Sequence, residues 1–267
     1  MRIIELELRT ACLSEMKEFY TDQLGLACVG EAEQSVTFMA GETRLTFVRE
    51  ERQGYLPSYH LAMNIPENRI LEAKSWLMAR GCSVLPAIPI PGAGIQANEN
   101  IAYFEGTDAH AFYFKDPSGN LIEFIARHRM GNTSEESFDS ASILNISEIG
   151  LPLRGEVPEV IRCLETRLDV SPYFGDGRMF QMLGDDQGMF ILGDLSIGWY
   201  PSMEIPEIHP IRVTVLDDRE AEFQMDPYPY FIRTVSAFLF SGGMNSSPTA
   251  LTSSLNGRYI ENDQITQ

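Results

Sequence analysis

The chain has 267 residues, of which 44% are hydrophobic, enough for one large domain or two smaller ones. Its 38 acidic side chains outnumber 20 basic ones and give a formal net charge of −18, so its field repels polyanions. This balance argues against nucleic acid and anionic membranes as partners. It leaves a homodimer open as an oligomeric state.

The cysteines and the N-terminus indicate the compartment. Cys12, Cys28, Cys82 and Cys163 lie far apart and lack the short paired spacing of a structural zinc site or a redox motif. The first ten residues, MRIIELELRT, carry charges at every second or third position, unlike a signal peptide, and no later run has the length of a membrane span. We therefore expect free thiols and a cytoplasmic protein.

The first fifty residues predict a strand, a helix and two further strands. Residues 3 to 9 alternate between apolar and charged side chains, which is typical of a half-buried strand. Ser14 can cap a helix whose apolar stripe runs to Leu24, and Gly25 can end it. The segments SVTFMAG and TRLTFVRE then alternate as two strands.

The same order recurs from residue 59. The strand YHLAMNIP is followed by a helix over about 67–80, which Gly81 ends, and then by the strands CSVLP, AHAFYFK and NLIEFIAR. The Pro/Gly-rich stretch at 86–100 is too long for a plain connection, and such loops often border a site.

A third copy of the pattern follows at an offset near 143 residues. Its segments are ILNISEIGLPL, EVIRCLETRLDV, RMFQMLG and QGMFILGD, and the offset places Glu148 opposite Glu5. A fourth copy begins at IHPIRVTV, where His209 falls opposite His60, and it degenerates after Asp218. We therefore expect a module over residues 1–130, a polar linker at 131–142, a degenerate module over 143–241 and a disordered tail at 242–267.

The most specific segment is FYFKDPSGNLIEFIAR. It predicts a hairpin in which Pro117 and Gly119 form a tight turn between two alternating strands. This aromatic strand, DPxGN turn and following acidic residue, together with FYTDQLGL at the first helix end, resemble the vicinal-oxygen-chelate superfamily, the glyoxalase, bleomycin-resistance and extradiol-dioxygenase-like proteins. The resemblance is good over residues 1–128, fair over 143–200 and weak beyond.

The resemblance implies an α+β fold of tandem βαβββ units whose curled mixed sheets form cups, with two modules of which the second is incomplete. It also implies a divalent metal ion held by the first strand of each unit and the last strand of the second. In this sequence those positions are Glu5, His60 and Glu123. Alternation supports the set independently, because it turns all three side chains away from the apolar face of their strands.

This sequence departs from the pattern at Glu5, where many metal-binding members have histidine. Two carboxylates and one imidazole favour Mn²⁺ or Mg²⁺, with Fe²⁺ or Zn²⁺ as alternatives. Arg44 lies near the position where glyoxalase-type members use a further glutamate, which argues against a glyoxalase. Glu5 could instead form a salt bridge with Arg9 or Arg44.

Other polar and aromatic residues leave alternatives open. His110 is a candidate general base, or else a polar residue at the start of a strand. Glu148 and His209 could form a second site, or remain as parts of a half that has lost one. Trp199 and Tyr200 are expected to line the second cup.

Two functions of different classes follow from the resemblance. The first is a metal-dependent lyase, isomerase or ring-cleaving dioxygenase that acts on a small oxygen-chelating substrate. The second is a non-catalytic protein of the bleomycin-resistance type that binds or sequesters a small molecule. The fold alone does not decide between them.

Overall fold

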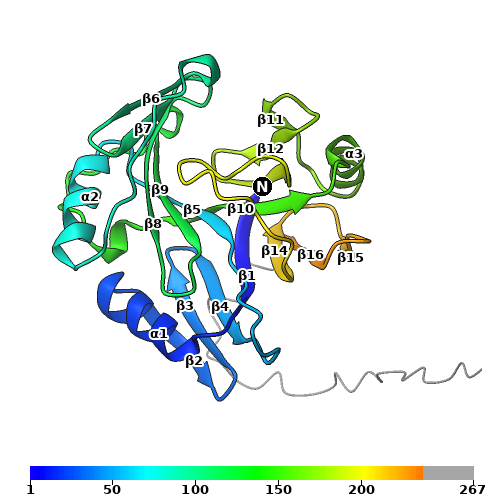
Figure 1. Cartoon of the computed structure of the whole chain (residues 1–267), viewed down its shortest axis with the longest axis horizontal. Coiled ribbons are helices and arrows are strands. Elements are labelled where there is room, and N and C mark those ends of the chain that lie inside the picture. The colour runs from blue at the N-terminus through cyan, green and yellow to red at the C-terminus, as the bar shows by residue number, and fades with distance from the viewer. Residues whose placement is uncertain (237–267) are drawn as a thin grey trace, which may run out of the picture.

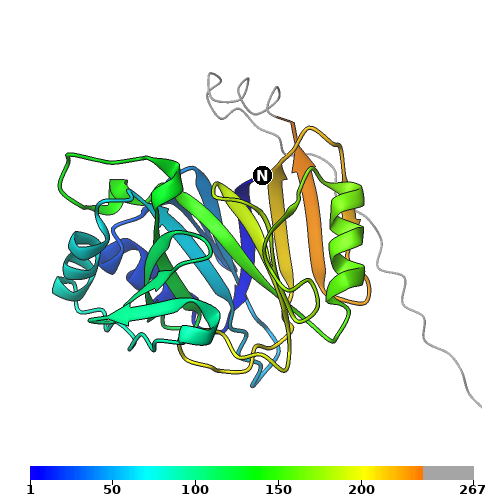
Figure 2. The ribbon, with the colours of Figure 1, turned by 90° about the horizontal axis from the view of Figure 1, so that it is seen from above.

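The structure is a computed structural model that describes residues 1–236. Two mixed sheets dominate this range, and three α-helices lie at their outer sides (Figures 1 and 2). The predicted tail at 242–267 lies outside the described residues. Within residues 1–236, no helix has both the length and the apolar character needed to cross a membrane.

Seven strands form the first sheet, in the order β15, β16, β14, β1, β4, β3 and β2. Their bounds are β1 Arg2–Thr10, β2 Ala27–Ala32, β3 Ser35–Ala40, β4 Thr43–Arg49, β14 Ile211–Leu216, β15 Glu222–Gln224 and β16 Tyr230–Val235.

Nine strands form the second sheet, in the order β11, β12, β13, β10, β5, β9, β8, β7 and β6. Their bounds are β5 His60–Ile65, β6 Ile95–Asn98, β7 Ile101–Phe104, β8 Ala109–Lys115, β9 Leu121–Arg127, β10 Asn145–Leu153, β11 Pro172–Gly175, β12 Phe180–Asp185 and β13 Gly188–Asp194.

Helical segments connect these strands. The α-helices are α1 Leu13–Glu18, α2 Ile70–Ala79 and α3 Val157–Arg167, and short turns of other helical types are η1 Phe19–Gln23, η2 Pro91–Ala93, η3 His128–Met130 and η4 Ser140–Ser142. The first predicted helix thus widens to π-type geometry in η1, and Gly25 ends it with a φ of 65°.

Each sheet combines strands from both halves of the chain. Strand β1 runs antiparallel to β14, and β5 runs antiparallel to β10 (Figure 1). The first repeat therefore shares a sheet with the fourth, and the second repeat shares one with the third. The stretch at 131–142 separates the repeats in sequence, but the two sheets do not divide there.

A continuous hydrophobic core joins the two sheets to each other and to the three α-helices. It includes Leu6 and Leu8 from β1, Leu61 from β5, Phe124 from β9 and Leu151 from β10. Because side chains alternate along a strand, the residues between these positions face the opposite, concave surfaces. The predicted alternation in the first strand is confirmed, with Leu6 buried and its polar neighbours partly exposed.

Two local expectations were wrong. The segment CSVLP forms only a single bridge, from Val84 to Phe114, and the strands of this unit come instead from residues 95–104. The fourth repeat continues further than predicted, because β15 and β16 follow Asp218 and extend the first sheet.

Candidate metal centre

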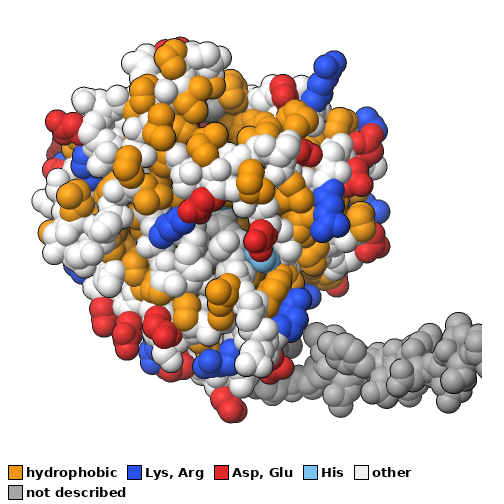
Figure 3. Space-filling view, viewed as in Figure 1, with side chains coloured by type: hydrophobic (Ala, Val, Ile, Leu, Met, Phe, Trp, Pro, Cys, Tyr) orange, Lys and Arg blue, Asp and Glu red, His pale blue; other side chains and the backbone are white. Residues whose placement is uncertain are grey.

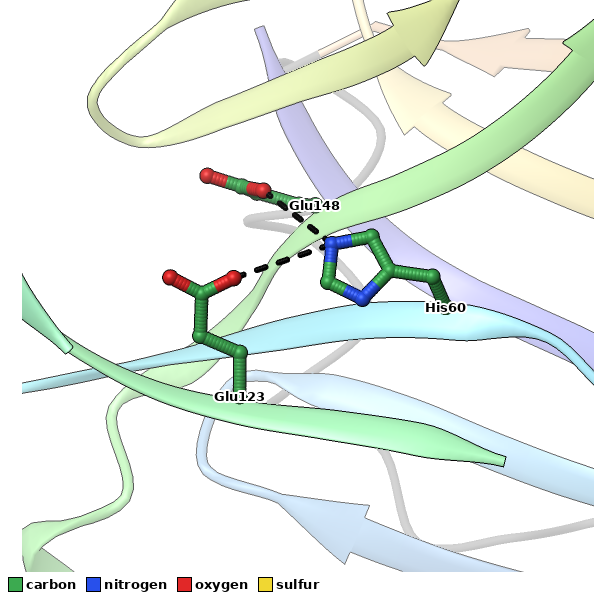
Figure 4. A group of neighbouring side chains, drawn as sticks. All are labelled: His60, Glu123 and Glu148. Atoms are coloured by element: carbon green, nitrogen blue, oxygen red, sulfur yellow. Dashed lines mark ion pairs between the residues drawn. The ribbon is translucent and has the colours of Figure 1, made fainter. Parts of the chain in front are cut away.

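Three buried side chains converge on the concave face of the second sheet: His60 on β5, Glu123 on β9 and Glu148 on β10 (Figure 4). Their donor atoms all lie within 4.8 Å of one another. His60 Nε2 is 3.7 Å from Glu123 Oε2 and 3.8 Å from Glu148 Oε2. The three residues are 6%, 3% and 3% exposed, respectively.

Strand register explains the convergence. Strand β5 lies between β9 and β10, and its Ala62 is the partner of both Glu123 and Glu148. His60 lies two residues before Ala62 and so projects from the same face. The methyl side chain of Ala62 leaves the space between the two carboxylates open.

The Asp-Pro-Ser-Gly-Asn turn holds His60 in place. Asn120 Oδ1 accepts a hydrogen bond from the Tyr59 backbone N–H at 2.8 Å, next to His60 in the chain. His60 Nδ1 lies 3.2 Å from the Leu121 carbonyl oxygen, which can only accept. Nδ1 therefore carries hydrogen, and His60 presents a lone pair of Nε2 toward the carboxylates once Nε2 has lost its proton.

The turn is stable because its polar groups satisfy one another. Asp116 Oδ1 accepts from the backbone N–H groups of Ser118 and Asn120, each at 3.0 Å, and its Oδ2 accepts from Tyr20 at 3.0 Å. Gly119 has a φ of 83°, a backbone conformation that residues with a side chain rarely adopt. The DPSGN turn, on which the family resemblance of the sequence rests, therefore also supports His60.

The two carboxylates differ in their surroundings. Burial, followed by the negative charge of Glu148, raises the pKa of the Glu123 carboxyl to about 8. Burial also acts on Glu148, but Arg127 and His60 outweigh it and lower the pKa of Glu148. Arg127 Nη2 donates a hydrogen bond to Glu148 Oε1. A buried pair of like charges with one cationic neighbour ionises unequally, which gives these opposite shifts.

The residues present fit a divalent cation. Separations of 3.7 and 3.8 Å are too long for direct hydrogen bonds. Donors at roughly 2.1 Å from a common ion lie about 3–4 Å apart. One imidazole with its other nitrogen anchored, and two carboxylates that carry a net negative charge, form a donor set that attracts such an ion.

A cavity of about 310 Å³ opens above the three donors. Its walls are mainly apolar and include Phe104, Tyr113, Phe174, Phe180, Met182, Trp199 and Tyr200. Figure 3 shows apolar side chains gathered over β6, β7, β11 and β12, with charged ones mostly at the periphery. The predicted border loop contributes Ile90 and Ile95 to the walls, and its Ile88 exchanges hydrogen bonds with the Tyr200 hydroxyl.

Trp199 packs directly beside the donors. Its ring centroid is 5.3 Å from that of His60. A Cβ added at Gly150 would lie 2.9 Å from the Trp199 ring, so glycine on β10 gives the indole room to rest on the sheet. Trp199 and Tyr200 thus line the cavity of His60 and not a separate second cup.

Glu5 does not belong to this group, and its expected convergence with His60 and Glu123 was wrong. Its side chain is 46% exposed on the first sheet, where it accepts hydrogen bonds from Thr214 at 3.0 Å and Arg233 at 3.1 Å. The reason is the sheet pairing, because β10 and not β1 lies beside β5. Glu148, the counterpart of Glu5 in the repeat, takes its place.

His110 does not reach the cavity, so its interpretation as a general base there was wrong. On β8, Ala111 and Tyr113 belong to the cluster on the concave face, which turns His110 to the other side. His110 Nδ1 lies 2.7 Å from His128 Nε2, and burial, with the charge of His128, lowers the His110 pKa.

His209 is also remote from Glu148, and the two do not form a second site. Its Nδ1 lies 2.6 Å from the Tyr55 hydroxyl, and its ring packs against Tyr59.

The comparisons with known proteins agree with this fold. Residues 2–124 match the model of the Glyoxalase/Bleomycin resistance protein/Dioxygenase superfamily. A comparison with curated proteins found no match. The crystal structure of a proposed dioxygenase from Bacillus subtilis subsp. subtilis str. 168 is 14% identical, covers 88% of this chain and 85% of its own, and has a TM-score of 0.55.

A shorter structure matches less of the chain. Lactoylglutathione lyase from Agrobacterium tumefaciens is 21% identical over 46% of this chain and 91% of its own, with a TM-score of 0.35. The resemblance seen in the sequence is confirmed over residues 2–124, the part of the chain that matches the model of the Glyoxalase/Bleomycin resistance protein/Dioxygenase superfamily.

Proposed function

We propose that this chain binds a divalent metal ion at His60, Glu123 and Glu148 and acts as an enzyme on a small organic substrate with adjacent oxygen donors. The observation that supports this most is the convergence of three buried donors on the floor of a mainly apolar cavity. Buried carboxylates are costly unless a cation pairs with them. Apart from His60 itself, Arg127 is the only basic side chain within ion-pair distance of either carboxylate among the described residues.

The donor set favours Mn²⁺ or Mg²⁺, because two of three ligands are hard carboxylate oxygens, and the imidazole leaves Fe²⁺ and Zn²⁺ as alternatives. When bound, such an ion polarises substrate oxygens and stabilises negative charge that develops on them. Lyases, isomerases and ring-cleaving dioxygenases all use that chemistry.

The surrounding side chains have separate tasks. Burial, and then the charges of Glu123 and Glu148, raise the pKa of Tyr113 well above its usual value, so its hydroxyl stays protonated and can donate to a substrate oxygen. Trp199 and Phe104 offer apolar surfaces for the rest of the substrate. These walls also exclude water, which strengthens electrostatic interactions inside the cavity.

A titration tests the metal. Protein freed of metal with EDTA is titrated with Mn²⁺, Co²⁺ and Zn²⁺ in a calorimeter, beside His60→Ala and the control His110→Ala. We expect one site per chain in wild type and in His110→Ala, and its loss in His60→Ala. Equal binding by all three proteins would place any metal elsewhere.

The aromatic walls favour a second candidate, a non-catalytic protein that sequesters an aromatic compound in the cavity. Catechol, which carries two adjacent oxygens, and toluene, which carries none, separate the two functions. A metal-dependent enzyme binds catechol more tightly when Co²⁺ is present and shifts the Co²⁺ absorption spectrum. A sequestering protein binds both compounds equally with and without the ion.

A further inference from the structure

We infer that Arg127 is a positioning residue of the centre, which fixes the Glu148 oxygen that can ligate and sets the net charge of the loaded site. This inference rests on the proposed metal function. Arg127 ends β9, four residues after Glu123 and on the same face, and it is fully buried.

The contacts of Arg127 divide the Glu148 carboxylate into two parts. Arg127 Nη2 donates to Oε1, whereas Oε2 faces His60 Nε2 at 3.8 Å. Arg127 is itself fixed, because its Nε donates to Asn64 Oδ1 at 3.0 Å. Asn64 in turn donates to Asn145 at 3.2 Å and to the Asp186 carbonyl oxygen at 2.8 Å. Glu148 is therefore held so that only Oε2 is available to an ion.

The charge of the buried group follows from the same contacts. With neutral His60 and both carboxylates ionised, as metal binding requires, Glu123, Glu148 and the guanidinium of Arg127 carry a net charge of −1. A divalent ion changes this to +1, whereas without Arg127 the loaded centre would be neutral. A loaded centre with positive charge draws electron density from a coordinated oxygen more strongly than a neutral one.

Asp186 also lies near Arg127, with Oδ1 3.7 Å from Nη1. Its side chain is partly exposed and accepts a hydrogen bond from Tyr173 at 2.6 Å. Water screens its charge more effectively than that of the buried carboxylates. Arg127 Nη1 has no hydrogen-bond partner among the described residues, so Asp186 does not compete with Glu148 for a hydrogen bond from the guanidinium.

Stability alone explains this arrangement poorly. The free energy needed to transfer both charges of a buried ion pair out of water often exceeds the free energy gained from their attraction. An arginine retained only for stability should also affect metal binding equally whatever residue stands at position 148. An arginine that orients Glu148 should affect metal binding differently when another residue stands at position 148.

A double-mutant cycle separates these cases. Arg127→Met is made in the wild type and in Glu148→His, and Co²⁺ affinity is measured by calorimetry and by visible absorption. Loss of the guanidinium charge favours cation binding in both backgrounds, but only the background with Glu148 also loses an oriented oxygen ligand. We expect Arg127→Met to improve Co²⁺ binding by at least about tenfold more in Glu148→His than in wild type.

Arg233→Met is the matched control, because Arg233 pairs with Glu5 at the exposed counterpart position. It should change Co²⁺ affinity by less than about twofold. Melting temperatures of the metal-free proteins show which variants fold. If Glu148→His does not fold, Glu148→Gln replaces it, because it removes the same negative charge.

The two failures are distinguishable. Equal effects of Arg127→Met in both backgrounds, with wild type binding Co²⁺, overturn the role of Arg127 alone. Absence of Co²⁺ binding by wild type overturns the proposed metal function and, with it, this inference.

Discussion

The buried Glu123 carboxyl should give the metal-free protein a measurable pH dependence of stability. Its pKa is about 8 in the folded protein and about 4.5 when unfolded. Because the folded value is the higher one, the folded state holds a proton that the unfolded state has released. The stabilisation is therefore fully present below pH 4.5 and is lost as the pH rises towards 8.

The magnitude follows from the two pKa values. Each unit of difference corresponds to about 1.4 kcal/mol, so the loss between pH 4.5 and 8 amounts to roughly 3–5 kcal/mol. Solvent screening reduces this little, since the side chain is 4% exposed. Domains are typically stable by about 5–15 kcal/mol, so the effect is a large fraction of the total.

Urea unfolding of EDTA-treated protein at five pH values from 5 to 9 measures this loss. Glu123→Gln cannot ionise, so we expect wild type to lose stability relative to this variant up to about pH 8 and to run parallel above it. Glu5→Gln is the control and should follow the wild-type curve within about 1 kcal/mol. Parallel curves of wild type and Glu123→Gln throughout would refute the reasoning. Saturating Co²⁺ should reverse the slope, because an ion needs the ionised carboxylate.

Three further predictions concern the site and its support. Glu148→Gln should weaken Co²⁺ binding by at least about tenfold in calorimetric titrations, whereas Glu5→Gln should leave it unchanged, and equal losses would restore Glu5 to the centre. Asn120→Ala removes the acceptor of the Tyr59 N–H and should lower the free energy of unfolding by about 1–3 kcal/mol in urea titrations. Trp199→Ala should weaken catechol binding by about two- to tenfold in fluorescence or calorimetric titrations without changing Co²⁺ affinity, and a loss of both would place Trp199 in the support of His60.

Much of the site was visible in local sequence. The alternation around His60 and Glu123 predicts their common face, because side-chain direction in a strand has a period of two residues. The DPSGN turn identifies the hairpin that carries Glu123, since its proline and glycine fit a tight turn. The period of about 143 residues also marked Glu148 as the counterpart of Glu5. The cytoplasmic location and the homodimer stay predictions.

Tertiary structure decided which third side chain joins His60 and Glu123. Which repeats share a sheet depends on pairing between strands more than eighty residues apart, and alternation within a strand carries no information about its neighbour. Thus β10 lies beside β5 and brings Glu148 to His60, while β1 pairs with β14 and leaves Glu5 with Arg233. The sequence by itself determined the repeats, most of their strands and the common face of His60 and Glu123. Only the long-range pairing of β5 with β10 determined which carboxylate, and which arginine, completes the centre.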